Sequence, residues 1–253
     1  MALSTPDDDR SRRELTPTGG GTPDPLREAA DVMRAVRDRC VWTQQIDHRA
    51  LVPYLVEESA ELIDAVEDGT REELREELGD LLWQVLFHSE IASRDEDDPF
   101  DIDDVARGLT EKMVRRHPHV FGDAVATTPE EVLVHWNAAK AAEKHQRRSV
   151  LDGVSERMPS LALAQKLLSK ASQVGLDPAK VQLADESAVG SLLLGDQLHS
   201  RGSEAGRPES EVELGDALLA LVATARANGW DAERALRERL RALEHDIRAA
   251  EAS

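Results

Sequence analysis

The 253-residue sequence is poor in aromatic residues, at 3%, and contains a single cysteine, Cys40. With so few rings, a core has to be built from Leu, Val and Ala, which favours packed helices. One cysteine excludes an internal disulfide framework and suits a reducing cytosol. The first 24 residues hold no apolar run, so we expect a disordered tail over 1–24 rather than a signal peptide or membrane span. These features predict a cytoplasmic protein.

Positive charge is also scarce. The chain has 31 Lys and Arg residues but 50 Asp and Glu residues, so its net charge is −19. An acidic surface of that size repels phosphate backbones and anionic lipids. We therefore expect no nucleic acid polymer and no membrane as a main partner. A polyanionic substrate is compatible only where a cation neutralises the local field.

Strand-like alternation is nearly absent, whereas helical periodicity recurs from Leu26 almost to the end of the chain. The sequence therefore predicts an all-α fold. The predicted helices cover 26–39, 49–67, 70–94, 101–116, 129–145, 159–172, 179–199, 209–227 and 230–250.

The chain contains an internal repeat. EELGDLLWQVLFHSEIA (76–92) resembles VELGDALLALVATARA (212–227), and the upstream EESAE (57–61) resembles DESAV (185–189). Two motifs that recur in the same order indicate a duplication. The expected organisation is a first helical domain over 25–150, a connecting helix over 151–172 and a second copy over 173–253.

The stretch from 57 to 80 holds eleven carboxylates and two arginines. Around a helix that turns about 100° per residue, Glu58 and Glu77 both lie about 60° from the central apolar residue of their helix. On the same side, Glu61 and Asp80 both lie about 120° away. The two helices thus repeat one pattern, with two carboxylates along one edge of an apolar stripe that we expect to be buried. That stripe comprises Val56, Leu62, Ile63 and Val66 in the first helix and Leu78, Leu81, Leu82 and Val85 in the second.

The other acids of the stretch fit a solvated helix face. Glu72, Glu73 and Glu76 alternate with Arg71 and Arg75, which is typical of exposed helix surfaces.

Four carboxylates that converge between two helices raise one another's pKa values and are stable as anions only beside cations. An all-oxygen ligand set suits Mg²⁺ or Mn²⁺. A di-iron site in a helical bundle would instead require Glu-x-x-His pairs, and here His88 lies two turns beyond Asp80. Since Mg²⁺ held by few carboxylates keeps open positions for water and phosphate oxygens, the pattern indicates phosphate chemistry.

Basic groups that could complete such a site follow later in the chain. The segment EKMVRRH supplies Lys112 and Arg116, and Trp136 and Lys140 are four residues apart on one predicted helix face. This pair fits a nucleotide, with Trp136 stacked on the base and Lys140 at a phosphate. The alternative is a Trp in the core and a Lys at the surface. The HPH tripeptide that begins at His117 is expected to end a helix rather than to bind metal.

The sequence resembles the MazG family of nucleoside triphosphate pyrophosphohydrolases in the order of its motifs. These are EExxE (57–61), ExxD (77–80), RRHPHVF (115–121), the Trp136/Lys140 pair and LDGVSERMPSLALAQKLLSKASQVGLD (151–177). The resemblance implies tandem all-α MazG-like domains and a four-helix-bundle core completed by dimerisation, hence a homodimer. It also implies hydrolysis of an NTP or dNTP substrate between the α and β phosphates. The metal ligands that it implies, for Mg²⁺ or Mn²⁺, are Glu58, Glu61, Glu77 and Asp80. Of these, Glu58 or Glu61 would orient the attacking water. The substrate contacts that it implies are Lys112, Arg116, Trp136 and Lys140.

The sequence departs from the family pattern in two places. The CPWD motif near the start is replaced by CVWT at Cys40–Thr43, and the second copy has Val189 where the first has Glu61. The lost carboxylate predicts a weak or inactive second copy. Two other functions stay open: a base-specific all-α dUTPase- or dCTPase-like enzyme, and a non-catalytic helical dimer with a regulatory role.

Overall fold

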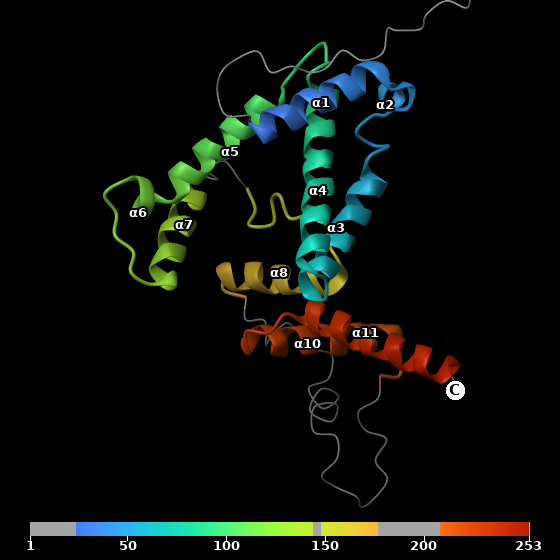
Figure 1. Cartoon of the computed structure of the whole chain (residues 1–253). Coiled ribbons are helices and arrows are strands. Elements are labelled where there is room, and N and C mark those ends of the chain that lie inside the picture. Colours follow the sequence, from blue (N-terminus) through green and yellow to red (C-terminus); the bar gives the residue numbers. More distant parts are fainter. Residues whose placement is uncertain (1–23, 144–147, 177–207, 253) are drawn as a thin grey trace, which may run out of the picture. The chain divides into compact units, whose positions relative to one another are not determined.

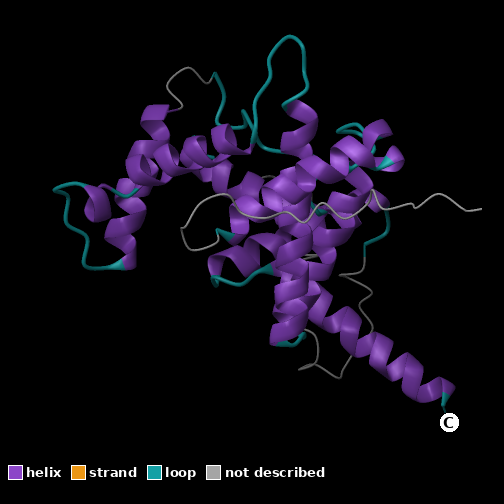
Figure 2. Cartoon of the chain, turned by 45° about the horizontal axis from the view of Figure 1, so that its top comes forward, coloured by secondary structure: helices purple, strands orange, loops and turns teal. Residues whose placement is uncertain are grey.

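The computed structural model of the chain describes residues 24–143, 148–176 and 208–252. Every regular element in these ranges is a helix, which confirms the all-α prediction (Figures 1 and 2). The chain divides into two compact units, 1–142 and 143–253. The helix expected over 179–199, with the repeated DESAV motif, lies outside the described residues.

The helices of the first unit are α1 (Pro25–Arg39), α2 (Val41–Gln45), α3 (Val52–Glu67), α4 (Arg71–Ala92), α5 (Ile102–Arg116), α6 (Pro118–Phe121) and α7 (Pro129–Glu143). Those of the second unit are α8 (Ser160–Gln173), α10 (Glu211–Ala227) and α11 (Ala232–Glu251). No helix in the described ranges is long and apolar enough to cross a lipid bilayer.

The observed boundaries lie within three residues of the predicted ones, and two short helices were missed. Helices α2 and α6 span five and four residues, which is too short for a helical period to be recognised. Helix α3 begins at Val52 instead of residue 49, because Pro53 occupies its first turn, where proline is favoured.

A tight turn reverses the chain between α3 and α4. A Cβ at position 69 would lie 2.6 Å from the Cα of Ala65, so only glycine fits there. Thr70 then caps α4: its Oγ1 accepts from the Glu73 N–H (3.2 Å), and its own N–H donates to Glu73 Oε2 (2.6 Å). Glu73 is therefore part of a capping box and not simply a solvated acid as expected, and these hydrogen bonds lower its pKa.

The capping box predicts a measurable effect on stability. Thr70→Ala is expected to lower the free energy of unfolding by about 1 kcal/mol, since the first turn of α4 loses its side-chain acceptor. Urea denaturation followed by circular dichroism measures the change. The control is Thr110→Ala on α5, where the hydroxyl only donates to the Ala106 carbonyl of its own helix (2.9 Å). An effect of equal size in both variants would argue against a capping role.

The core of the first unit lies between α1 and α4. Ala30 and Met33 of α1 pack against Leu86 and Phe87 of α4, together with Leu51 just before α3. These contacts fix the start of α3 beside α4, and thereby set the register in which the acidic segments of the two helices meet.

The apolar stripe expected to be buried is largely exposed in the single chain, although its members Leu62, Leu81 and Leu82 are half-buried. Val56 and Val66 are each 64% exposed and Leu78 is 53% exposed, so this prediction was wrong for one chain. The reason is that α3 and α4 pack together through their acidic edges, leaving the stripes on an outer surface. We call this surface the hairpin face; its exposed members are Val52, Val56, Ile63, Val66, Leu78 and Val85. Contiguous apolar surfaces of this kind mark interaction sites.

Candidate active site

Three of the four carboxylates singled out in the sequence meet between α3 and α4. Glu58 of α3 and Glu77 and Asp80 of α4 each offer a carboxylate oxygen, and these oxygens lie within 4.8 Å of one another. They come together because the chain reverses at Gly69 and Thr70, so that α4 runs antiparallel to α3 and beside it (Figure 1). We call these three residues the acidic centre.

Glu61, the fourth candidate, lies at the border of the acidic centre and outside its three-residue group. Its side chain is exposed, and its charge contributes to raising the pKa of Glu58 and of Glu77. Glu61 is therefore electrostatically coupled to the acidic centre without being part of its closest contacts.

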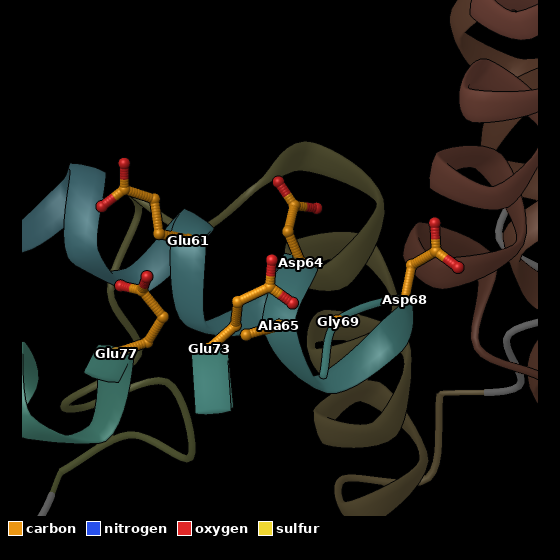
Figure 3. A pocket seen from close by; sticks show the side chains of 7 residues that line it. All are labelled: Glu61, Asp64, Ala65, Asp68, Gly69, Glu73 and Glu77. Carbon is orange, nitrogen blue, oxygen red and sulfur yellow. The ribbon is translucent and has the colours of Figure 1, made fainter. Parts of the chain in front are cut away.

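An acidic hollow of about 320 Å³ opens beside the acidic centre. Glu61 and Glu77 lie at one end of it and Asp68 at the other (Figure 3). No basic side chain is among the residues that line it, which are Glu61, Asp64, Ala65, Asp68, Gly69, Glu73 and Glu77. The hollow thus has an electrostatic environment that attracts cations and repels an unaccompanied phosphate.

Burial raises the pKa of Glu58, followed by the charges of Asp80, Glu61 and Glu77. Burial also raises the pKa of Glu77, followed by the charges of Glu61 and Asp80. Because a raised pKa means that the folded state holds protons more tightly than the unfolded state, these two groups make the stability of the metal-free chain fall as pH rises through the unfolded and then the folded pKa. A cation bound at the acidic centre would offset this repulsion.

The residues of the acidic centre fit a hard divalent cation. Glu77 Oε2 is buried and accepts no hydrogen bond from any residue that the structure describes, and a buried acceptor without a partner is uncommon. All the donor atoms are carboxylate oxygens, the ligand type that hard divalent cations prefer.

The basic and aromatic candidates lie on α5 and α7. The Arg116 guanidinium carbon is 4.9 Å from the centre of the Trp136 ring. The centres of the His117 and Trp136 rings are 5.3 Å apart, and their planes meet at 69°. Arg116 and His117 therefore both contact the Trp136 ring, which joins α5 and α7. Lys112 and Lys140 are both partly buried on these helices.

The HPH segment ends α5, as the sequence predicted, and then begins α6. The ring Nδ1 of His117 pairs with the Met113 carbonyl oxygen at 2.7 Å. Across the described ranges, the acidic centre is the only group of three His, Cys, Asp or Glu side chains at coordination distance.

Two histidines form a contact that sequence reasoning missed. The Nδ1 atoms of His48 and His88 are 2.7 Å apart, and their ring planes differ by 7°. Burial and the neighbouring His48 lower the pKa of His88, which favours the neutral imidazole. His88 is thus paired with the segment before α3 rather than with the carboxylates. The two residues are forty positions apart, so no local pattern relates them.

The second unit uses the counterpart of Glu77 differently. Glu213 occupies that position in the repeat, but it is the third residue of α10, whereas Glu77 is the seventh of α4. Glu213 Oε2 accepts the Glu209 N–H (2.8 Å), and Ser210 Oγ accepts the Glu213 N–H (3.2 Å). The carboxylate of Glu213 is thus engaged in capping its own helix.

Comparison with known proteins gives one matching family model, described as the MazG nucleotide pyrophosphohydrolase domain, over residues 46–121. That range contains α3, α4, α5 and α6, and with them the acidic centre.

Three curated relatives extend the similarity over most of the chain. An uncharacterised 26.1 kDa protein of Streptomyces cacaoi is 44% identical, covering 89% of this chain and 82% of the relative. The nucleoside triphosphate pyrophosphohydrolase/pyrophosphatase MazG of Thermotoga maritima is 38% identical, covering 85% and 81%. The nucleoside triphosphate pyrophosphohydrolase of Escherichia coli K12 is 33% identical, covering 87% and 84%.

Proposed function

The chain belongs to the MazG nucleotide pyrophosphohydrolase family, and from this premise we propose that it hydrolyses nucleoside triphosphates with the help of Mg²⁺ or Mn²⁺. Water would attack between the α and β phosphates, giving a nucleoside monophosphate and pyrophosphate. The observation that carries the proposal is the acidic centre, where carboxylates of adjacent helices come within 4.8 Å.

In this proposal Glu58, Glu77 and Asp80 hold the cation. The cation supplies charge stabilisation at the phosphate oxygens and lowers the pKa of the attacking water. Glu61 is the candidate group to orient that water and accept its proton, because it lies at the border of the acidic centre and is not among its closest contacts. The sequence alone could not separate Glu61 from Glu58 in this role.

The positive charges on α5 and α7 would bind the substrate. Lys112, Arg116 and Lys140 would offset the negative charge of the triphosphate in the transition state. Trp136, half-buried on α7, would stack on the base. Because stacking is available to every base, this arrangement supports a broad base preference.

Two copies of the chain are proposed to pair through the hairpin face. The apolar residues on α3 and α4 have no cover within the described part of the first unit, and pairing two such faces would build a four-helix bundle. The second unit is proposed to be non-catalytic, since Glu213 serves as a helix cap and Val189 replaces a carboxylate.

Product analysis tests the proposed reaction. The purified chain is incubated with Mg²⁺ and a panel of standard and damaged NTPs and dNTPs, and phosphorus NMR identifies the products. Monophosphate plus pyrophosphate from several bases is the expected result. Activity on one base alone would favour a dUTPase- or dCTPase-like enzyme, and no hydrolysis would favour a non-catalytic helical dimer. Release of orthophosphate would contradict cleavage between the α and β phosphates.

A further inference from the structure

Among the residues that the structure describes in the first unit, Gln84 on α4 has the most deeply buried polar side chain, with 1% of its surface exposed. Neither its amide oxygen nor its amide nitrogen has a hydrogen-bond partner among the described residues. An unpaired buried amide is costly and uncommon in folded proteins. Where one occurs, an ordered water or a ligand is its usual partner.

The position of Gln84 relates it to the acidic centre. It follows Asp80 by one helical turn and Glu77 by two, and the seven-residue step places it about 20° from Glu77 around the helix. Helical side chains lean toward the N-terminal end, so the Gln84 amide extends toward the turn that carries Asp80.

Most of the buried atoms without a partner belong to residues at this angular position on α4. In the described residues there are four such side-chain atoms: Glu77 Oε2, Gln84 Oε1, Gln84 Nε2 and His119 Nδ1. Three of the four thus belong to two residues on one stripe of a single helix. A water molecule between the Gln84 amide and the Asp80 carboxylate, one turn apart, would have the two polar partners that a buried water needs.

Packing alone does not account for Gln84. Phe87, which follows Gln84 by three residues and lies about 60° from it around α4, belongs to the apolar core. A methionine would fill nearly the same volume there without leaving an amide unpaired.

We propose that Gln84 is a positioning residue of the acidic centre, which holds a buried water against the carboxylate of Asp80. The amide nitrogen donates to the water oxygen, and the water donates to one carboxylate oxygen of Asp80, so that the other oxygen of Asp80 faces the cation. The inference deepens the proposed function and rests on it. Replacing a residue that orients metal ligands in this way commonly lowers metal affinity by about 10- to 100-fold.

The test is Gln84→Met, which removes both amide atoms and keeps the length of the side chain. Mn²⁺ binding is measured without nucleotide, by the loss of the free-ion EPR signal. The dissociation constant for Mn²⁺ is expected to rise about tenfold or more, while the melting temperature of the metal-free chain stays the same or increases. In NTP hydrolysis the variant is expected to need more metal and to recover activity at high Mn²⁺.

The matched control is Gln173→Met on α8, where the exposed amide oxygen accepts from Lys170 Nζ (3.2 Å). This variant is expected to bind Mn²⁺ like the unsubstituted chain. If Gln84→Met does not fold, Gln84→Asn keeps the amide but withdraws it by one methylene, and a smaller loss of Mn²⁺ affinity is expected.

Unchanged Mn²⁺ affinity and unchanged metal dependence in a folded Gln84 variant would overturn the inference and assign the residue to packing. If the unsubstituted chain binds Mn²⁺ but hydrolyses no NTP, the proposed function fails. Weakened Mn²⁺ binding by the Gln84 variant would then still support its positioning role.

Discussion

Replacing Glu77 with glutamine is expected to lower kcat for NTP hydrolysis by about 10³-fold, because a cation at a phosphate contributes several kcal/mol and each 1.4 kcal/mol is tenfold in rate. Glu77 is the acid to test because its Oε2 is buried without a partner. Glutamine keeps the shape of the side chain and removes its charge. Steady-state kinetics at saturating Mg²⁺ measures the loss.

The same substitution is expected to increase the melting temperature of the metal-free chain. Burial and, after it, the neighbouring carboxylates raise the pKa of Glu58 and Glu77. Neutral glutamine has no charge to bury and no longer repels Glu58, so the decline of stability with rising pH should become shallower. Added Mg²⁺ should stabilise the unsubstituted chain and have little effect on the variant. Thermal melts at several pH values, with and without Mg²⁺, separate these effects.

The internal repeat provides a matched control. Glu213→Gln makes the same chemical change at the corresponding position of the second unit and is expected to leave kcat unchanged. Full activity in Glu77→Gln, or equal losses in the two variants, would contradict the assignment of catalysis to the first unit.

Val56→Asp is expected to convert the proposed homodimer into monomers and to reduce activity by about 10²-fold or more, because an unpaired charge in an apolar interface is strongly unfavourable. Val56 is 64% exposed on α3 and lies about 160° around the helix from Glu58. A direct effect on the acidic centre is therefore not expected. Analytical ultracentrifugation measures the association state, and kinetics at the same concentrations measure activity.

Val125→Asp is the control for the hairpin face. Val125 is 76% exposed and lies in the loop between α6 and α7, so its replacement should alter neither association nor activity. A Val56→Asp chain that stays dimeric, or a monomeric one that keeps full activity, would show that the hairpin face is not the proposed interface.

Much of the fold was predictable because long helices with capping signals leave clear periodic patterns. Helix α4 has a Thr70 cap and twenty-two residues. Its predicted first and last residues differ from the observed ones by only one and two residues. The meeting of Glu58, Glu77 and Asp80 was also predictable, since both helices repeat one angular position. Helix α2, at five residues, is too short for this reasoning.

Other features depend on contacts that a single helix does not reveal. The apolar stripe of Val56 and Leu78 was expected in a core, but periodicity shows only that a face is apolar and not what covers it. A mid-helix glutamine such as Gln84 is ordinarily a surface residue, and only its burial in the fold distinguishes it. The stacking of Arg116 on Trp136 joins two helices whose approach the sequence does not encode locally.

A crystal structure of the chain soaked in Mn²⁺, with anomalous scattering recorded at the manganese edge, tests the central claim most directly. An anomalous peak is expected between α3 and α4, at coordination distance from carboxylate oxygens of Glu58, Glu77 and Asp80. A peak only at another place, for example beside His48 and His88, with none at the acidic centre, would contradict it.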